Sequence, residues 1–191
     1  DVEVVDGKKK APVAFAGLAA PLAALSAARA ASANGRLLLD VKSEADATRT
    51  LHAVTLTNKG TEQAWLLVRA VVRRQPAGDW RYFNGNYSVL NPAAPRLRTS
   101  LAYTMPMVAA YDDRSGVGLG FDPLQLFSHI ENEVRPGAGK APAAFAYGVK
   151  IVLDPGASET IRFAAFPFNA RWGEVSAVAA YQRLFPEAFQ P

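Results

Sequence analysis

The chain contains no cysteine and only two histidines, His52 and His129. The lack of cysteine excludes disulfides, thiolate nucleophiles and zinc–thiolate sites together. The two histidines lie far apart in the sequence, and neither has a second histidine at the spacing that metal ligands use. We therefore expect no metal site and no bound cofactor.

Long apolar runs and a concentrated positive charge are also missing. No stretch reaches the ~18 uninterrupted apolar residues of a membrane-spanning helix, so we expect no membrane span. The net charge is +4, and the basic residues occur singly or in short groups such as Lys8-Lys9-Lys10. A nucleic-acid interface instead gathers basic residues on one face and places aromatic residues among them. We expect no nucleic-acid partner.

The first 35 residues form a segment with its own composition. Residues 1–10 are polar and predict a loose arm or a short edge strand. In the Ala-rich run of residues 11–33, Phe15 and the later leucines recur at helical spacing, but such a run is also compatible with a strand and a long connection. Its order resembles a secretory signal, yet prolines interrupt it, so a structured or surface segment is favoured. Asn34-Gly35 predicts a turn.

From Arg36 onward the pattern is that of strands. Residues 37–41, 50–57 and 63–74 are strand-like, and Trp65 is assigned to the core. Asn58-Lys59-Gly60 is a turn signal, so these segments predict a meander of neighbouring antiparallel strands. Further strands are expected over residues 97–111, 117–121 and 126–134, with a turn at residues 112–116.

The last quarter of the chain predicts a hairpin and then a helix. Residues 145–153 alternate, Asp154-Pro155-Gly156 turns the chain, and Ile161 and Phe163 resume the alternation. From Trp172 onward, apolar residues recur at three- and four-residue steps until Pro186 stops them, which is the pattern of an amphipathic helix.

These elements indicate an all-β fold, an antiparallel β-sandwich with one C-terminal helix. The length of 191 residues, 50% of them apolar, favours a single core. We assign residues 1–35 to an N-terminal arm or Ala-rich segment and residues 36–189 to the sandwich with its closing helix. Residues 186–191 are assigned to the start of a linker.

A long aromatic segment, Gln75 to Pro95, is the predicted binding surface. Aromatic-rich loops of β domains are often functional. Sugar rings pack their C–H groups on aromatic faces, while their hydroxyls pair with amides. The alternative is that Trp80 and Phe83 fill one end of the core. The predicted carbohydrate-binding residues are Trp80, Tyr82, Asn84, Asn86 and Tyr87.

Catalytic motifs are not visible. The glycines at 116, 118 and 120 lack the spacing and the following helix of a dinucleotide fingerprint, and a strand thinned for a close neighbour explains them better. His129 and Glu131 are at strand spacing and would share one face of a sheet. They are the weak catalytic candidates, and a solvated strand face is the simpler interpretation.

Several short motifs carry a family resemblance. They are Tyr103 with Met105-Pro106, Asp112-Asp113 before the glycine run, Asp122-Pro123, Trp172-Gly173 and the ending Tyr181-Gln182-Arg183-Leu184-Phe185-Pro186-Glu187-Ala188-Phe189. Together they resemble the β-sandwich module that precedes the catalytic domain in bacterial glycoside-hydrolase-like proteins, a module of the galactose-mutarotase-like supersandwich type. The resemblance covers residues 80–189.

The resemblance implies a non-catalytic, carbohydrate-associated accessory module of a larger exported protein, which would be secreted or periplasmic. Its implied partners are a polysaccharide or oligosaccharide and a catalytic domain or neighbouring subunit. Mutarotases use a His and Glu acid–base set in their concave sheet, for which His52, His129, Glu131 and Glu133 are remote counterparts. One alternative is therefore an aldose-epimerase-like or lyase-like enzyme using His129 and Glu131. Another is a structural assembly subunit that packs through its N-terminal segment.

Overall fold

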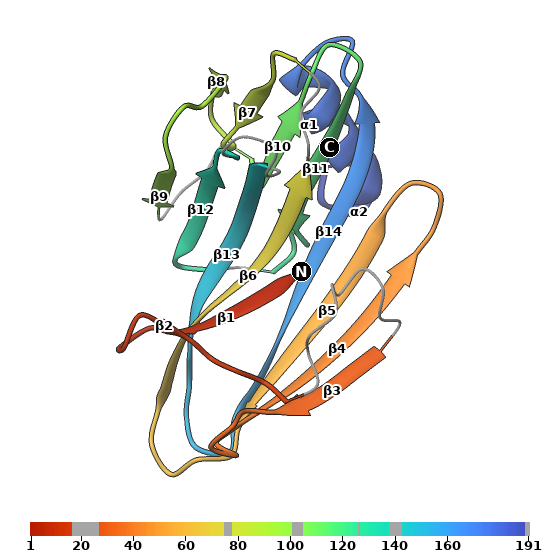
Figure 1. Ribbon diagram of the computed structural model, residues 1–191. Coiled ribbons are helices and arrows are strands. Elements are labelled where there is room, and N and C mark those ends of the chain that lie inside the picture. The colour runs from red at the N-terminus through yellow and green to blue at the C-terminus, as the bar shows by residue number, and fades with distance from the viewer. Residues whose placement is uncertain (17–26, 75–77, 101–104, 126, 138–142, 190–191) are drawn as a thin grey trace.

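The computed structural model describes residues 1–16, 27–74, 78–100, 105–125, 127–137 and 143–189. Two antiparallel sheets pack face to face over a common core, and helices cover part of the larger sheet at one end (Figure 1). The predicted fold class, an antiparallel β-sandwich with a C-terminal helix, is confirmed.

The sheets contain six and eight strands. In spatial order, the six-stranded sheet consists of β2 (Ala11–Pro12), β1 (Val2–Asp6), β6 (Ala64–Arg74), β13 (Ala143–Leu153), β12 (Ile130–Arg135) and β9 (Arg96–Ser100). The eight-stranded sheet consists of β3 (Ala27–Ala31), β4 (Leu37–Ala45), β5 (Thr50–Asn58), β14 (Ser158–Asn169), β11 (Ser115–Phe121), β10 (Met107–Tyr111), β7 (Arg81–Phe83) and β8 (Ser88–Leu90). Helices α1 (Glu174–Leu184) and α2 (Pro186–Phe189) follow β14.

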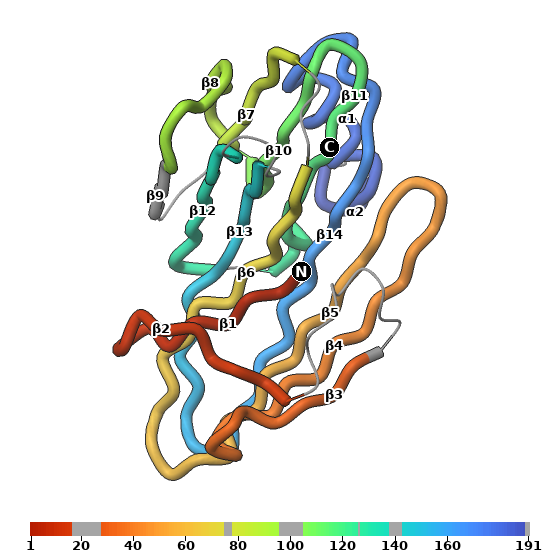
Figure 2. The backbone as a smooth tube through the Cα atoms, in the orientation of Figure 1, coloured from red at the N-terminus to blue at the C-terminus, as the bar shows by residue number. Residues whose placement is uncertain are grey.

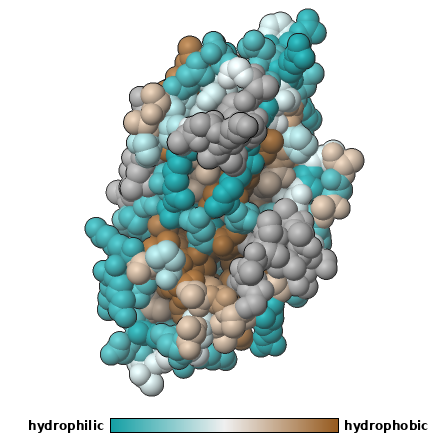
Figure 3. All heavy atoms as spheres, viewed as in Figure 1, coloured by the Kyte–Doolittle hydropathy of each residue, from teal (hydrophilic) through white to brown (hydrophobic). Residues whose placement is uncertain are grey.

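The core lies where alternate residues of the two sheets face each other. Phe121 of β11 and Tyr147 of β13 meet across this interface with ring centroids 4.5 Å apart. Figure 3 shows hydrophobic atoms in the middle of the molecule and hydrophilic atoms around much of its periphery. Burying one such side chain contributes ~1.5–3 kcal/mol. Core residues with 0% exposure include Val54, Leu56, Val68, Val149 and Phe163.

The predicted hairpin over residues 145–163 is wrong in its pairing. β13 pairs with β6 and β12, whereas β14 pairs with β5 and β11, so the turn at residues 154–156 carries the chain from one sheet to the other. The predicted meander over residues 37–74 is also wrong in one pairing, because β5 and β6 lie in different sheets and not side by side. Figure 2 shows both crossovers at one end of the molecule. The pairing of β4 with β5 is as predicted.

Asn58, at the end of β5, holds both crossovers. Its side chain is buried at 0% exposure, and its Nδ2 donates to the carbonyls of Glu62 and Leu153 at 2.8 and 3.0 Å. Its Oδ1 accepts the N–H of Gly60 at 3.0 Å, and its backbone exchanges hydrogen bonds with Gly156 and Ala157. One buried amide therefore satisfies backbone groups of both connections.

Asn58→Ala is expected to lower the free energy of unfolding by roughly 2 to 4 kcal/mol, because the buried Leu153 carbonyl and the partly buried Glu62 carbonyl lose their donor. Urea denaturation measures the change. Gln63→Ala is the control, since Gln63 Nε2 bridges the same crossovers by donating to Asp154 Oδ1 at 2.8 Å but is exposed. The control should change stability by less than ~0.5 kcal/mol. Equal losses in both variants would contradict the role given to the buried amide.

The glycine run on β11 makes room for the helical layer. A Cβ on Gly116 would stand 2.1 Å from the ring of Phe168, and a Cβ on Gly118 would stand 2.2 Å from the ring of Phe166. Both rings come from the neighbouring strand β14. These rings belong to a second core cluster that the buried Tyr181 of α1 completes. The sequence-based interpretation of the run as a thinned strand is therefore confirmed. The predicted helix is α1, which ends before Pro186.

The N-terminal segment contributes to both sheets. β1 is not a loose arm or an edge strand, because it lies between β2 and β6. The described parts of the Ala-rich run are strands β2 and β3 and an isolated bridge between Phe15 and Ser32, while residues 17–26 of the predicted helical spacing lie outside the described residues. The boundary at residue 35, the linker at residues 186–191 and packing of this segment on a neighbouring subunit stay predictions.

Candidate functional site

A groove of about 900 Å³ lies on the outer face of the six-stranded sheet. Strand alternation explains its lining, since Trp65, Leu67 and Arg69 of β6 point away from the core-facing Leu66 and Val68. The remaining walls come from the neighbouring strands, the turn after β1, residues 127–129 before β12, and Glu159 of β14. The polar and aromatic residues that line it include Lys10, Trp65, Arg69, His129, Glu131 and Lys150.

Trp65 forms an apolar platform in this groove. It is 48% exposed and pairs with Val152 of β13, which is 47% exposed. A large aromatic side chain half in water on a regular strand is held rigidly by its backbone, yet offers a ring face to a ligand. The sequence pattern assigns Trp65 to the core, and this is wrong. Arg69 lies four residues from Trp65 along β6, so the two side chains are on the same face of the strand. The charge of Arg69 is the sequence signal that could have placed Trp65 on the outer face of the sheet.

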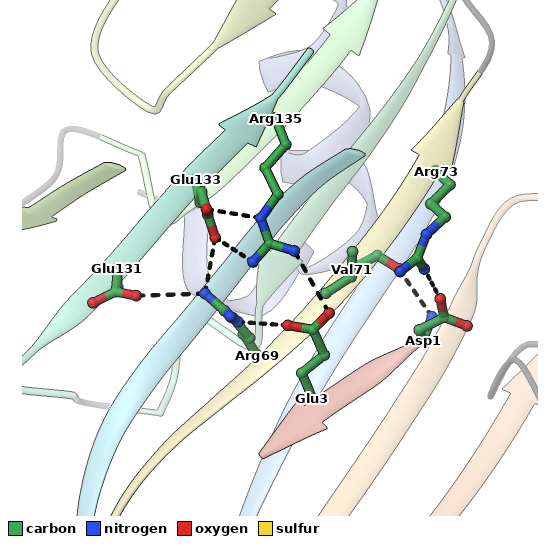
Figure 4. Close-up of polar contacts among 8 residues, drawn as sticks. All are labelled: Asp1, Glu3, Arg69, Val71, Arg73, Glu131, Glu133 and Arg135. Carbon is green, nitrogen blue, oxygen red and sulfur yellow. Dashed lines mark hydrogen bonds and ion pairs between the residues drawn. The ribbon is translucent and has the colours of Figure 1, made fainter. Parts of the chain in front are cut away.

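Beside the platform lies a closed ring of four alternating charges (Figure 4). Arg69 Nε and Nη1 donate to Glu3 and Glu133, both at 2.9 Å. Arg135 Nη2 donates to Glu133 at 2.6 Å, and its Nη1 lies 3.8 Å from Glu3 Oε1. The bonds to Glu133 raise the pKa of Arg135 above its ordinary value. The ring is neutral in sum.

Glu131 extends this ring into the groove. Its side chain is 9% exposed, and its two oxygens lie 3.8 Å from Arg69 Nη1 and 3.6 Å from Lys150 Nζ. His129 is exposed at the same face, and its carbonyl accepts the N–H of Lys150 at 3.0 Å. The structure therefore brings His129 and Glu131 to one groove, as the catalytic alternative requires, but the carboxylate is already engaged by two cations.

The side chain of Arg69 extends across β13 to β12 because the residue that it passes over on β13 is a glycine. Gly148 pairs with Arg69 in register, and a Cβ at Gly148 would stand 2.5 Å from Arg69 Cβ and 2.8 Å from the Val68 carbonyl oxygen. Contacts this short with fixed atoms leave no room for a side chain. The guanidinium therefore bonds to Glu133, one strand beyond its own neighbour.

The predicted aromatic surface is partly interior. Gln75–Pro95 is not a plain loop, because it contains β7 and β8. Tyr82 is 3% exposed and donates from its hydroxyl to Asn132 Oδ1 at 3.2 Å. Asn84 is 5% exposed, and its Oδ1 accepts the N–H groups of Asn86 and Tyr87, each at 3.1 Å. Tyr82 and Asn84 thus support the structure from inside.

Three of the predicted residues reach the surface to different degrees. Asn86 and Tyr87 are exposed on the turn that Asn84 shapes, and Tyr87 is 52% exposed. Trp80 is partly buried against the core between the sheets. The predicted surface is therefore reduced to Asn86, Tyr87 and an edge of Trp80.

A hydrogen-bonded group next to this turn attaches α1 to the sheet. Tyr111 donates from its hydroxyl to Glu174 Oε2 at 2.5 Å, and Ser88 Oγ lies 2.9 Å from the Tyr111 hydroxyl. The bond from Tyr111 lowers the pKa of Glu174, while burial and then this carboxylate raise the pKa of Tyr111. The group fixes the first turn of α1 and gives no sign of a reactive pair.

His52 lies apart from the groove, on β5 of the other sheet. It is 8% exposed, and its Nδ1 is 2.7 Å from Ser43 Oγ. Burial lowers the pKa of the imidazole below its ordinary value of 6.5. His52 is therefore a neutral structural histidine, and it does not join His129 or Glu131.

The shifted pKa of His52 predicts a pH dependence of stability. As the pH falls through 6.5, the unfolded chain binds a proton that the folded chain does not, so the free energy of unfolding should fall until the lower folded pKa is reached. His52→Gln should remove this part of the dependence. His129→Gln, at an exposed position, should keep it. Thermal melts from pH 8 to 5 measure it, and identical profiles for the two variants would refute the assignment.

Metal and membrane features are not apparent in the described ranges. Among these residues no group of three or more His, Cys, Asp or Glu side chains is arranged to hold a metal ion. Within the same residues no helix has the length and apolar character needed to cross a membrane.

Comparison with known proteins identifies the fold. No protein-family model and no curated protein sequence matches the chain. Among solved structures, it is similar to the GH36 α-galactosidase AgaA from Geobacillus stearothermophilus, with a TM-score of 0.57 at 13% identity over 88% of this chain and 30% of that one. The galactosidase domain of the α-galactosidase-sucrose kinase AgaSK gives a TM-score of 0.55 at 12% identity, over 87% of this chain and 27% of that one.

A smaller protein matches over most of its length. A galactose mutarotase-like protein from Lactobacillus casei gives a TM-score of 0.51 at 10% identity, over 83% of this chain and 74% of that one. The fold is that of the galactose-mutarotase-like β-sandwiches, as the sequence resemblance implies. Identities this low show the fold alone. The chain spans 30% of the length of the α-galactosidase AgaA.

Proposed function

We propose that this chain is a non-catalytic, carbohydrate-binding β-sandwich module of a larger glycoside-hydrolase-like protein. The observation that carries the proposal is the groove beside Trp65, where a half-exposed aromatic ring lies among charged and polar side chains. Sugar-binding sites combine these two kinds of surface, because a pyranose has apolar C–H faces and a polar rim.

The similarity to longer enzymes supports the modular part of this proposal. Nearly all of this chain superposes on less than a third of the α-galactosidase AgaA, with coverages of 88% and 30%. A unit of this size is compatible with an accessory domain beside a catalytic one. The polysaccharide partner and the catalytic partner domain are part of the proposal.

The charge ring supports a non-catalytic role. Glu3 and Glu133 are bonded to Arg69 and Arg135, and Glu131 lies between Arg69 and Lys150. A general acid or base needs lone pairs directed at the substrate and a proton that it exchanges readily. Carboxylates held by arginine act instead as fixed parts of the sheet. The turn with Asn86 and Tyr87 stays a predicted second contact surface for sugar.

Trp65→Ala is expected to abolish retention on a polysaccharide affinity gel while changing stability by roughly 1 kcal/mol or less, because half of the ring is already in water. Affinity electrophoresis and a thermal melt measure the two effects. Trp172→Ala is the control, since Trp172 is 69% exposed and precedes α1 instead of lining the groove. Retention that survives Trp65→Ala would refute the proposed site.

The alternative of an aldose-epimerase-like enzyme has one observation in its favour, namely that His129 and Glu131 line the same groove. In that case anomer interconversion, followed by polarimetry, should show a bell-shaped pH dependence, and His129→Ala should lower the rate by about 100-fold or more. His52→Gln is the matched control. A rate equal to that of buffer for the unaltered chain would eliminate this alternative.

A further inference from the structure

We propose that the sugar bound beside Trp65 is acidic and carries a carboxylate or sulfate group at the edge of its ring. This inference rests on the proposed function and adds the chemical class of the ligand. It follows from the charged groups around the platform, because Asp6 and Glu131 are already engaged within the chain, whereas Lys10 has no ion-pair partner among the described residues.

Two carboxylates at the groove, Asp6 and Glu131, have partners within the chain. Asp6 Oδ1 accepts the backbone N–H groups of Lys8 and Lys9 at 2.9 and 3.0 Å, so this carboxylate closes the turn after β1. These bonds lower the pKa of Asp6. Glu131 lies between two cations, as described above. Glu159, at the start of β14, is an exposed acid at the rim of the groove.

Cationic donors also line the groove. The turn that Asp6 closes places Lys10 at the rim, held by a 2.7 Å bond from its N–H to the Asp6 carbonyl. Within the described part of the chain Lys10 has no ion-pair partner, so its ammonium group retains its N–H donors. Lys150 is 46% exposed in its side chain, and of the described carboxylates only Glu131 pairs with it.

The spacing of these groups suits one sugar unit. Val152 pairs with Trp65, and Lys150 lies two residues away from Val152 on the same face of β13. Two residues along a strand span about 7 Å, close to the width of a pyranose ring with its substituents. A ring stacked on Trp65 therefore presents its exocyclic substituents to Lys150 on one side. Gly7, bonded to the Trp65 carbonyl at 2.7 Å, brings the Lys8–Lys10 turn to the other side.

The direct test is calorimetric binding of the full chain to matched oligosaccharides. The probes are a galacturonate oligosaccharide, its carboxyl-reduced neutral form and a sulfated galactan oligosaccharide of the same length. At least one acidic probe should bind about tenfold more tightly than the neutral one, a ratio equal to ~1.4 kcal/mol. The preference should shrink as salt is raised, because exposed charges are screened. The two acidic probes distinguish carboxylate from sulfate.

Two variants show whether the preference belongs to the groove. Lys10→Gln should weaken the acidic probe several-fold and leave the neutral one unchanged. Lys42→Gln, exposed on the outer face of the other sheet, should change neither. Equal losses from both variants would mean diffuse attraction and would overturn the inference. Equal affinity for acidic and neutral probes, with both lost in Trp65→Ala, would overturn it but keep the proposed function. Binding of no probe would overturn both.

Discussion

The buried amide of Asn58 is the contact on which the arrangement of the two sheets depends. At one end of the sandwich the chain passes from one sheet to the other in two connections, β5 to β6 and β13 to β14, and both connections bond to this side chain. At the opposite end, Tyr82 of β7 packs on Phe145 of β13 with ring centroids 6.4 Å apart and bonds to Asn132 of β12. Polar side chains thus fix the position of the two sheets relative to each other. The remaining contacts between the sheets are largely apolar and would by themselves let the sheets slide.

Local pattern and long-range pairing differ in how much of this fold they reveal. Alternation places most strands and the spacing of apolar residues places α1, since both depend on neighbouring residues. The turn at Asp154-Pro155-Gly156 is equally visible, but a turn signal specifies a reversal and not the sheet to which the next strand belongs. β13 and β14 therefore look like a hairpin in the sequence although each completes a different layer.

The candidate site was harder to predict for a related reason. Trp65 lies in a run of apolar residues, where both faces of β6 look alike, and only Arg69 reveals which parity faces water. Clustered aromatic residues indicate Gln75–Pro95 as a surface, yet Tyr82 is needed between the sheets. The groove joins residues from β1, β6, β12 and β13, which no short segment contains. Such a site follows from topology, and the resemblance of folds does not supply it.

Arg69 has a mechanical consequence. Backbone hydrogen bonds of a sheet connect only adjacent strands, so resistance to sliding is normally passed from each strand to the next. Arg69 bonds from β6 past β13 to β12, and Arg135 lies against Glu3 from β12 to β1. The outer face therefore has cross-ties perpendicular to the strands, and a pull on β1 is shared with a strand that it never touches. A force applied by a docked domain or a bound polymer chain would therefore be distributed over these strands together.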